Sequence, residues 1–174
     1  MKYTLRTLLC LLLALCMALP MVSCGGKYND SLSAAKLCDS ITAELATEDG
    51  WRAASESYIS PSSWGEDYTD YLDKVAEYRI VVAENADMNI DEVGVFLCKS
   101  EKDAKDVKTF CENYLATKSL QLTPLLESYN PHELHKLDYA AVTVLGRYVV
   151  YTILSPANTA SAETAMEKAL TPAE

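Results

Sequence analysis

The sequence predicts an α+β domain: a mainly antiparallel four-stranded sheet made of two hairpins, packed by an N-terminal helix, a long central helix and a C-terminal helix. Two pairs of segments predict the strands, residues 78–84 with 93–99 and residues 140–145 with 148–154. All four are rich in β-branched and aromatic side chains. Apolar residues recur at helical spacing before, between and after these pairs, which predicts the helices.

The first predicted helix covers residues 31–47. Its apolar side chains share one face at helical spacing: Ala34, Leu37, Cys38, Ile41 and Leu45. Asn29, Asp30 and Ser31 are good N-caps, and Gly50 is expected to stop the helix.

The first pair of strands is joined by residues 85–91, which suit an antiparallel hairpin with a long loop. Gly94, inside the second strand, predicts a bulge or a close approach to the backbone. Glu92 stands at the mouth of the same strand. It either pairs with a nearby base such as Arg79 or Arg147, or it is solvated.

The central helix is predicted to begin at Ser100, with Asp103 close to a capping-box position. Its inner face is apolar: Ala104, Val107, Phe110, Cys111, Tyr114 and Leu115. Its outer face is charged and expected to be solvated: Lys102, Lys105, Asp106, Glu112 and Lys118. Pro124 is expected to kink or restart the helix.

The second hairpin turns at Gly146-Arg147, a pair that suits a type II′ turn. Both faces of residues 148–154 are apolar, which favours a strand covered on both sides. Residues 159–170 then predict the last helix, with a stripe of small and apolar side chains.

The N-terminus has the layout of a signal peptide. Lys2 and Arg6 precede an apolar run at residues 8–19, which is shorter than the roughly 20 residues that a spanning helix needs, and Pro20 follows. Residues 21–24 resemble the lipobox of bacterial lipoproteins, with Met21 in place of the usual leucine. The resemblance implies cleavage before Cys24 and attachment of a diacylglyceryl group to its thiol.

We therefore expect a signal peptide at residues 1–23, a lipidated tether at 24–30 and a single globular domain at 31–174. The protein is expected on the outer face of the cell membrane, held by lipid on Cys24, because two acyl chains suffice for stable anchoring. The net charge of −10 and the lack of any Lys and Arg cluster argue against a nucleic-acid partner. An acidic surface also gives no attraction to anionic lipids.

Three cysteines remain in the predicted domain: Cys38, Cys98 and Cys111. They are interpreted as buried thiols, or as containing one disulfide. For a disulfide, Cys98 and Cys111 are the better pair, because the strand that holds one leads directly into the helix that holds the other. No cofactor is expected.

No metal site is expected either. His132 and His135 follow a predicted helix start at Asn130-Pro131, but the HExxH pattern of zinc proteases is absent. Asp87, Asn89 and Asp91 have the spacing of the start of a calcium loop without the glycine and closing glutamate that it needs.

A binding surface is the other hypothesis drawn from side chains. Tyr68 and Tyr71 share one side of a short predicted helix or turn, and together with Tyr148 they could line a surface for a ligand or partner, or simply pack in the core.

The order of these segments resembles a family of small lipoproteins from clostridia and related Gram-positive bacteria, a domain of unknown function. The resemblance covers residues 35–170. It rests on residues 91–96 and 101–107, on Tyr129-Asn130-Pro131, and on residues 142–155 with Gly146 and Tyr148. It implies no catalytic residues.

Function is predicted at a coarse level. The sequence favours a non-catalytic binding or accessory module outside the cytoplasm, with a structural spacer without a ligand as the alternative. An extracytoplasmic enzyme is the third reading, and no GxSxG, HExxH or Gly-rich phosphate loop supports it.

Overall fold

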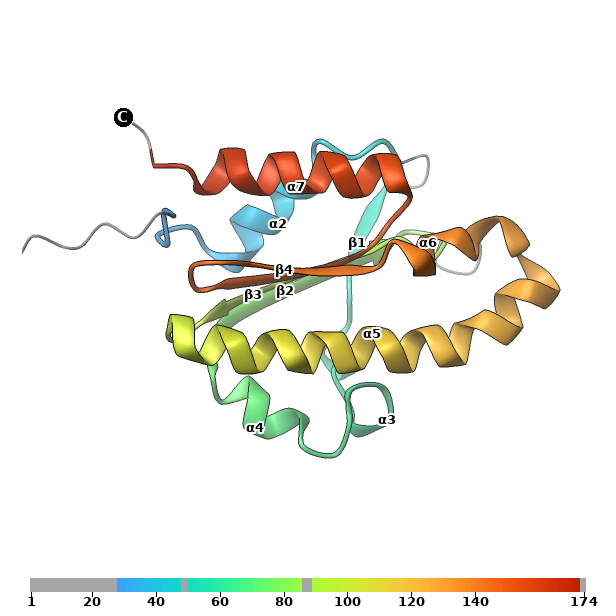
Figure 1. Ribbon diagram of the computed structural model, residues 1–174, viewed down its shortest axis with the longest axis horizontal. Helices are drawn as coiled ribbons and strands as arrows, with labels where there is room; N and C mark the ends of the chain where they lie inside the picture. Colours follow the sequence, from blue (N-terminus) through green and yellow to red (C-terminus); the bar gives the residue numbers. More distant parts are fainter. Residues whose placement is uncertain (1–27, 48–49, 86–88, 173–174) are drawn as a thin grey trace, which may run out of the picture.

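The computed structural model describes residues 28–47, 50–85 and 89–172 (Figure 1). Five strands form one antiparallel sheet in the order β1-β2-β3-β5-β4. They are β1 (Trp51–Ala53), β2 (Val75–Ala83), β3 (Glu92–Cys98), β4 (Ala141–Leu145) and β5 (Tyr148–Ile153). The predicted α+β class and both antiparallel pairs are confirmed.

The predicted strand number of four is wrong, because β1 adds a fifth strand at the edge of the sheet. It is three residues long, and its register places Arg52 opposite Val82. Its residues are half-buried or exposed and show no alternation of apolar and polar side chains. A strand this short carries no periodic signal in the sequence.

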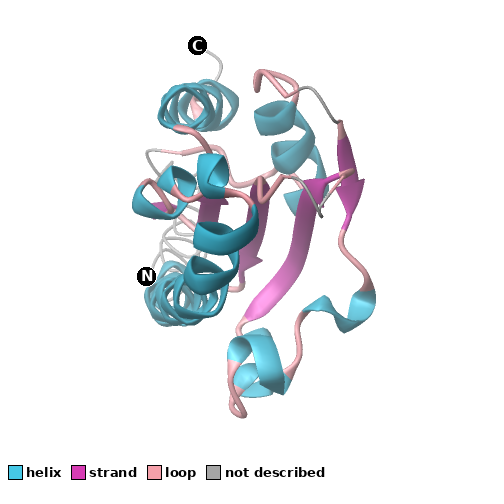
Figure 2. Ribbon diagram, turned by 90° about the vertical axis from the view of Figure 1, so that its right-hand side faces the viewer, coloured by secondary structure: helices cyan, strands magenta, loops and turns pink. Residues whose placement is uncertain are grey.

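Helices cover both faces of the sheet (Figures 1 and 2). Helices α2 (Ala34–Thr42) and α7 (Pro156–Leu170) pack on one face, and α5 (Glu101–Tyr129) runs along the other. Successive residues of a strand point to opposite faces. Val93 and Val95 of β3 therefore belong to the core under α2 and α7, whereas Phe96 belongs to the core under α5.

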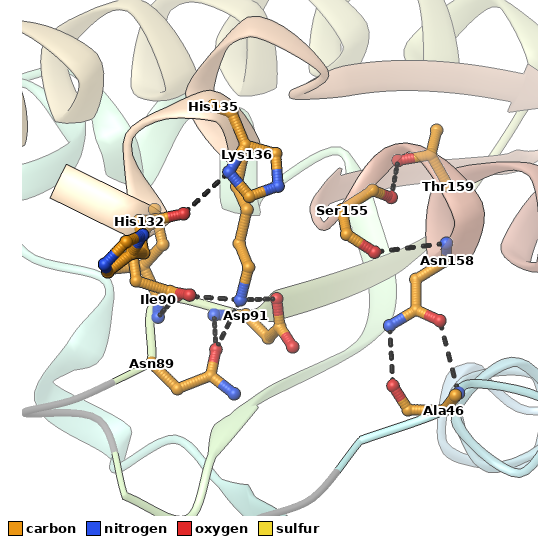
Figure 3. Close-up of polar contacts among 11 residues, drawn as sticks. Ala46, Asn89, Ile90, Asp91, His132, His135, Lys136, Ser155, Asn158 and Thr159 are labelled. Atoms are coloured by element: carbon orange, nitrogen blue, oxygen red, sulfur yellow. Dashed lines mark hydrogen bonds and ion pairs between the residues drawn. The ribbon is translucent and has the colours of Figure 1, made fainter. Parts of the chain in front are cut away.

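The remaining elements are short. On the α5 side, η1 (Glu56–Tyr58), α3 (Pro61–Trp64) and α4 (Tyr68–Leu72) connect β1 to β2, while η2 (Pro131–Glu133) and α6 (His135–Asp138) connect α5 to β4. Helix α5 continues through Pro124 to Tyr129 and bends towards its end, so of the two predicted outcomes the structure has a kink and no restart (Figure 1). Asn158 of α7 holds the chain after α2, since its amide exchanges two hydrogen bonds with the backbone of Ala46, at 2.9 and 3.2 Å (Figure 3).

The predicted signal peptide at 1–23, the lipidation site Cys24 and residues 25–27 of the predicted tether lie outside the described residues. Residues 28–30, expected to be tether, instead lie against the domain. The backbone N–H of Asn29 donates to the carbonyl of Leu170 at 2.7 Å. Across the described part of the chain, no helix combines the length and apolar character needed to cross a bilayer.

Candidate functional site

A buried carboxylate lies at the start of β3. Glu92 is 1% exposed and accepts hydrogen bonds on both oxygens. Its Oε1 accepts from the hydroxyls of Tyr114 (2.7 Å) and Tyr151 (2.5 Å), and its Oε2 accepts from the hydroxyl of Tyr58 (2.7 Å). Lys118 completes the group with an ion pair to Oε2. We call these five residues the Glu92 cluster.

The Glu92 cluster is a closed network. The ammonium of Lys118 donates to Glu92 and to the hydroxyls of Tyr58 (2.7 Å) and Tyr114 (2.9 Å), which uses its three donors. A buried charge is tolerated only when it is paired and hydrogen-bonded, and this carboxylate has four donors. No donor of the ammonium is left for a further group.

Burial and the negative charge of Glu92 set the protonation of the three phenols. Burial is the larger cause and the Glu92 charge the second. Together they raise the pKa of Tyr58, Tyr114 and Tyr151 above the ordinary value of 10.0. All three hydroxyls therefore stay protonated at neutral pH and act as donors to the carboxylate.

Gly94 makes room for this arrangement. It lies opposite Tyr151 in the β3–β5 pairing, and the tyrosine ring crosses directly over it. A Cβ atom at Gly94 would stand 2.0 Å from Cε1 of that ring. Gly94 and Glu92 are two residues apart on the same face, so the ring that covers the glycine brings its hydroxyl to the carboxylate. The predicted close approach to the backbone at Gly94 is confirmed.

Aromatic packing holds the cluster from the α3 side. Trp64 stacks on Tyr114 with ring centroids 3.8 Å apart and planes 4° apart. It also meets Tyr151 edge-on at 5.7 Å. These contacts restrict the rings whose hydroxyls bind Glu92.

A cavity of about 170 Å³ adjoins the cluster. It lies among β1, β2, the start of β3 and the middle of α5, and is lined by Arg52, Tyr58, Val82, Asn89, Ile90, Asp91, Glu92, Lys118 and Leu122. Arg52, Val82 and Glu92 form one row across the sheet, because each is the direct partner of the next. Among the described residues, the guanidinium of Arg52 makes neither a hydrogen bond nor an ion pair, although its charge acts on the hydroxyl of Tyr58.

A second polar group forms the neighbouring wall. The ammonium of Lys136 in α6 makes ion pairs with Asp91 (2.8 Å) and Glu133 (2.7 Å) and donates to Oδ1 of Asn89 at 2.9 Å (Figure 3). Glu133 also accepts from the backbone N–H of Ile90 at 2.9 Å. These contacts fasten the end of the β2–β3 connection to α6, and so fix the residues of this connection that line the cavity.

The structure corrects two predictions about Glu92. Arg147 instead pairs with Asp30 at 2.8 Å, and Arg79 points to the other face of the sheet from Glu92. Lys118, predicted on the solvated face of the central helix, is only 19% exposed and turns inward to the carboxylate. The spacing carries a sign of this, because Lys118 lies four residues after Tyr114 and so on the apolar face of the helix, but the sequence does not identify the acid that it pairs with.

The three tyrosines of the predicted binding surface do not come together. Tyr148 is fully buried under α2 and α7, where its hydroxyl donates to the carbonyl of Leu32 at 2.7 Å. Tyr68 and Tyr71 pack on the opposite face of the sheet, and Tyr71 stacks on Phe110 at 4.6 Å. The sequence did not identify Tyr58, Tyr114 and Tyr151 as site residues. Their hydroxyls all bind Glu92, which is distant from each of them in the sequence.

The cysteines of the domain are free and buried: Cys38, Cys98 and Cys111. Burial raises the pKa of the Cys38 and Cys98 thiols to about 12, and raises that of Cys111 well above its ordinary value. The structure therefore contains the three buried thiols rather than the Cys98–Cys111 disulfide. Both members of that pair lie in the core under α5.

The two histidines form a local contact. Nδ1 of His135 lies 2.7 Å from the backbone carbonyl of His132 (Figure 3). Within the described ranges, no group of three or more His, Cys, Asp or Glu side chains could hold a metal ion. Asp87, the first residue of the calcium-like spacing, lies outside them.

A family model for a domain of unknown function (DUF4358) matches residues 68–154. No curated protein and no solved structure matches the chain. The matched span runs from α4 to the end of β5 and contains Gly94 and every residue of the Glu92 cluster except Tyr58. The predicted resemblance to a domain of unknown function is confirmed.

Proposed function

We propose that this chain, which belongs to the DUF4358 family, is a binding module held on the outer face of the cell membrane by lipid on Cys24. The observation that carries the binding role is the cavity beside the Glu92 cluster. It combines a few polar groups with the apolar side chains of Val82, Ile90 and Leu122, as ligand sites commonly do.

The chemistry of the cluster supports binding rather than proton transfer. A general acid or base works best with a pKa near the operating pH, and the three phenols have pKa values raised away from it. Glu92 and Lys118 are fully engaged with each other and with these phenols. The Glu92 cluster thus serves as a rigid wall of the site.

Two groups in the cavity lining have donors to spare, and they define the ligand class. The guanidinium of Arg52 makes no hydrogen bond or ion pair with the described residues. Asn89 uses its Oδ1 to accept from Lys136 and from the backbone of Asp91 (2.8 Å), and its NH₂ group binds no other described residue, so we take it as a donor for a ligand. Guanidinium and amide donors recognise carboxylates. The volume of about 170 Å³ limits the ligand to a small carboxylate or to the C-terminal residue of a peptide.

The binding site is tested with N-acetylglycine and its neutral amide as probes. Both are titrated into the isotope-labelled protein, and backbone amide shifts of residues 89–92 are followed by NMR. We expect the acid to shift these signals and the amide to shift them at least several-fold less. In Arg52→Ala, the acid should no longer shift them. Leu122→Trp fills the cavity and should also abolish binding, whereas Leu125→Trp, on the exposed part of the same helix, should not.

Equal shifts with the acid and the amide would overturn the carboxylate specificity. Binding that survives Leu122→Trp would place the ligand elsewhere. Absence of any shift with either probe at tens of millimolar would favour the spacer alternative, in which the cluster only stabilises the fold.

The anchor is tested separately. Cys24→Ala removes the thiol that accepts the lipid, so we expect an uncleaved precursor that takes up no labelled fatty acid. Normal processing of this variant, together with unlabelled wild-type protein, would refute the proposed lipoprotein. The matched control is Cys38→Ala, which alters a buried thiol of the domain and should leave labelling unchanged.

A further inference from the structure

The first described residues are fastened to one end of the sheet. Beside the Asn29–Leu170 hydrogen bond, Arg147 in the β4–β5 turn makes an ion pair with Asp30 at 2.8 Å and donates to its backbone carbonyl at 3.1 Å. The described chain therefore begins beside the β4–β5 turn, at the left of the view in Figure 1.

The proposed lipid site is close to this point along the chain. Three residues, 25–27, separate Cys24 from Tyr28. Four Cα–Cα steps span at most about 14 Å even when fully extended. A lipid on Cys24 therefore holds the β4–β5 turn within about that distance of the bilayer surface.

The cavity is at the opposite end of the sheet. The backbone N–H of Cys98 donates to the carbonyl of Arg147 at 2.9 Å, so the last residue of β3 lies at the turn. Glu92 begins the same strand six residues earlier, which is about 20 Å away. Helix α5 starts at the turn end, and Leu122 lies 21 residues along it, about 31 Å at the helical rise.

From these positions we infer that the anchored protein stands with its β4–β5 turn facing the lipid surface and its cavity at the end of the sheet away from the membrane. The orientation rests on the proposed lipid at Cys24. The tether is shorter than the distance from the turn to the cavity, so the cavity reaches the bilayer only if the whole domain lies flat. The net charge opposes that, since it is −10 for the full sequence and more negative once Lys2 and Arg6 are cleaved off, and lying flat brings more acidic surface to anionic lipids.

In a competing arrangement, the far part of α5 lies on the bilayer. Leu120 (80% exposed), Leu125 and Tyr129 are exposed on the far part of α5, and such side chains could enter the interface of a bilayer. In that case the domain would lie on its side, and the distal helix would approach the lipids as closely as the turn does.

Two single-cysteine variants on the same helix separate these arrangements. Lys102→Cys lies near the start of α5 and Glu127→Cys near its end, and both wild-type residues are exposed. They are 25 residues apart, which is at most about 38 Å along the bent helix. The native thiols of the domain are buried, so a maleimide donor dye should attach to the introduced cysteine alone.

The full-length lipidated protein is placed in vesicles of phosphatidylcholine and phosphatidylglycerol that carry an acceptor dye on a small fraction of headgroups. We expect energy transfer from position 102 to be several-fold more efficient than from position 127. Comparable transfer from both positions, or more from 127, would overturn the orientation.

Flotation of the same samples separates this result from failure of the anchor. Wild-type protein should float with the vesicles and Cys24→Ala should not. If lipidated protein floats and both positions give the same energy transfer, the lipid anchor is supported and the proposed orientation is refuted. If wild-type protein does not float, the anchor is refuted and the orientation with it.

Discussion

Gly94→Ala is the most informative single change in this fold, because two principles predict opposite signs for it. Replacing glycine by alanine at a position with ordinary backbone angles stabilises a protein by about 0.4–1 kcal/mol through the unfolded chain. Gly94 has such angles, since the glycines with positive φ are Gly50, Gly65 and Gly146. On backbone grounds alone the variant should be more stable.

The packing predicts the reverse. The new methyl group would lie 2.0 Å from the Tyr151 ring, and the closest ordinary contact is 3.4 Å, so the ring has to retreat by about 1.4 Å. Its hydroxyl, 2.5 Å from Glu92, then moves out of hydrogen-bonding distance. Overpacking costs about 1–3 kcal/mol, and a lost hydrogen bond to a charged group about 1.5–3 kcal/mol. We expect a net destabilisation of about 2–5 kcal/mol.

Urea unfolding monitored by tryptophan fluorescence measures this difference. Tyr151→Phe is the matched control, because it keeps the ring over Gly94 and removes only the hydroxyl, and it should cost about 1.5–3 kcal/mol. In the double variant the hydroxyl is already absent, so Gly94→Ala should cost less than it does alone. An unchanged or raised free energy of unfolding in Gly94→Ala would refute the account of the site given above.

Three further predictions concern the buried charges, phenols and thiols. Glu92→Gln should lower the free energy of unfolding by about 3–5 kcal/mol, because it leaves Lys118 without its counter-charge. Adding Lys118→Met should recover part of that loss, and strict additivity in thermal or urea unfolding would contradict the pairing. The phenols of the Glu92 cluster keep their protons in the fold, whereas the unfolded chain releases them above pH 10.0. The contribution of these phenols to the free energy of unfolding should therefore be constant below pH 10. It should fall above that pH by about 1.4 kcal/mol per pH unit for each phenol, and Tyr58→Phe should make the decline shallower. The buried thiols add a decline of the same sign from pH 9.0, and a decline that Tyr58→Phe leaves unchanged would show that this phenol does not contribute. Finally, maleimide should label the domain's thiols only after unfolding, and mass spectrometry of native protein showing rapid modification would contradict their burial.

The sequence predicts most of the fold because its long elements are periodic. The stripe on α5 and the two hairpins are read directly from apolar spacing, and Ser100 caps α5 as expected, accepting from the N–H of Asp103 at 3.1 Å. What it does not reveal depends on contacts distant in sequence. Strand β1 has three residues without alternation, and its place at the edge is decided by pairing with β2.

The candidate site, too, could be predicted from the sequence only in part. Glu92 and Gly94 are singled out in the sequence because an acid and a glycine are unusual in an apolar strand, and both lie at the centre of the site. Their partners cannot be recognised, because tyrosines are found both in cores and at surfaces, and a lysine is mostly exposed unless it has an acidic partner that the sequence does not name. Lys118 is the clearest example: it lies four residues after Tyr114, on the same face of the helix, and only its charge suggests a solvated side chain rather than a partner of Glu92.

The Glu92 cluster also has a consequence for how the chain folds. Its carboxylate is bound by residues 22, 26, 34 and 59 positions away in sequence, drawn from α5, η1 and β5. A partly folded chain that has formed β3 under α5 but lacks one of these segments buries a negative charge with too few donors, at a penalty of several kcal/mol. We therefore expect such intermediates to be scarcely populated, and the sheet, the long helix and the β1–β2 connection to dock in one cooperative transition.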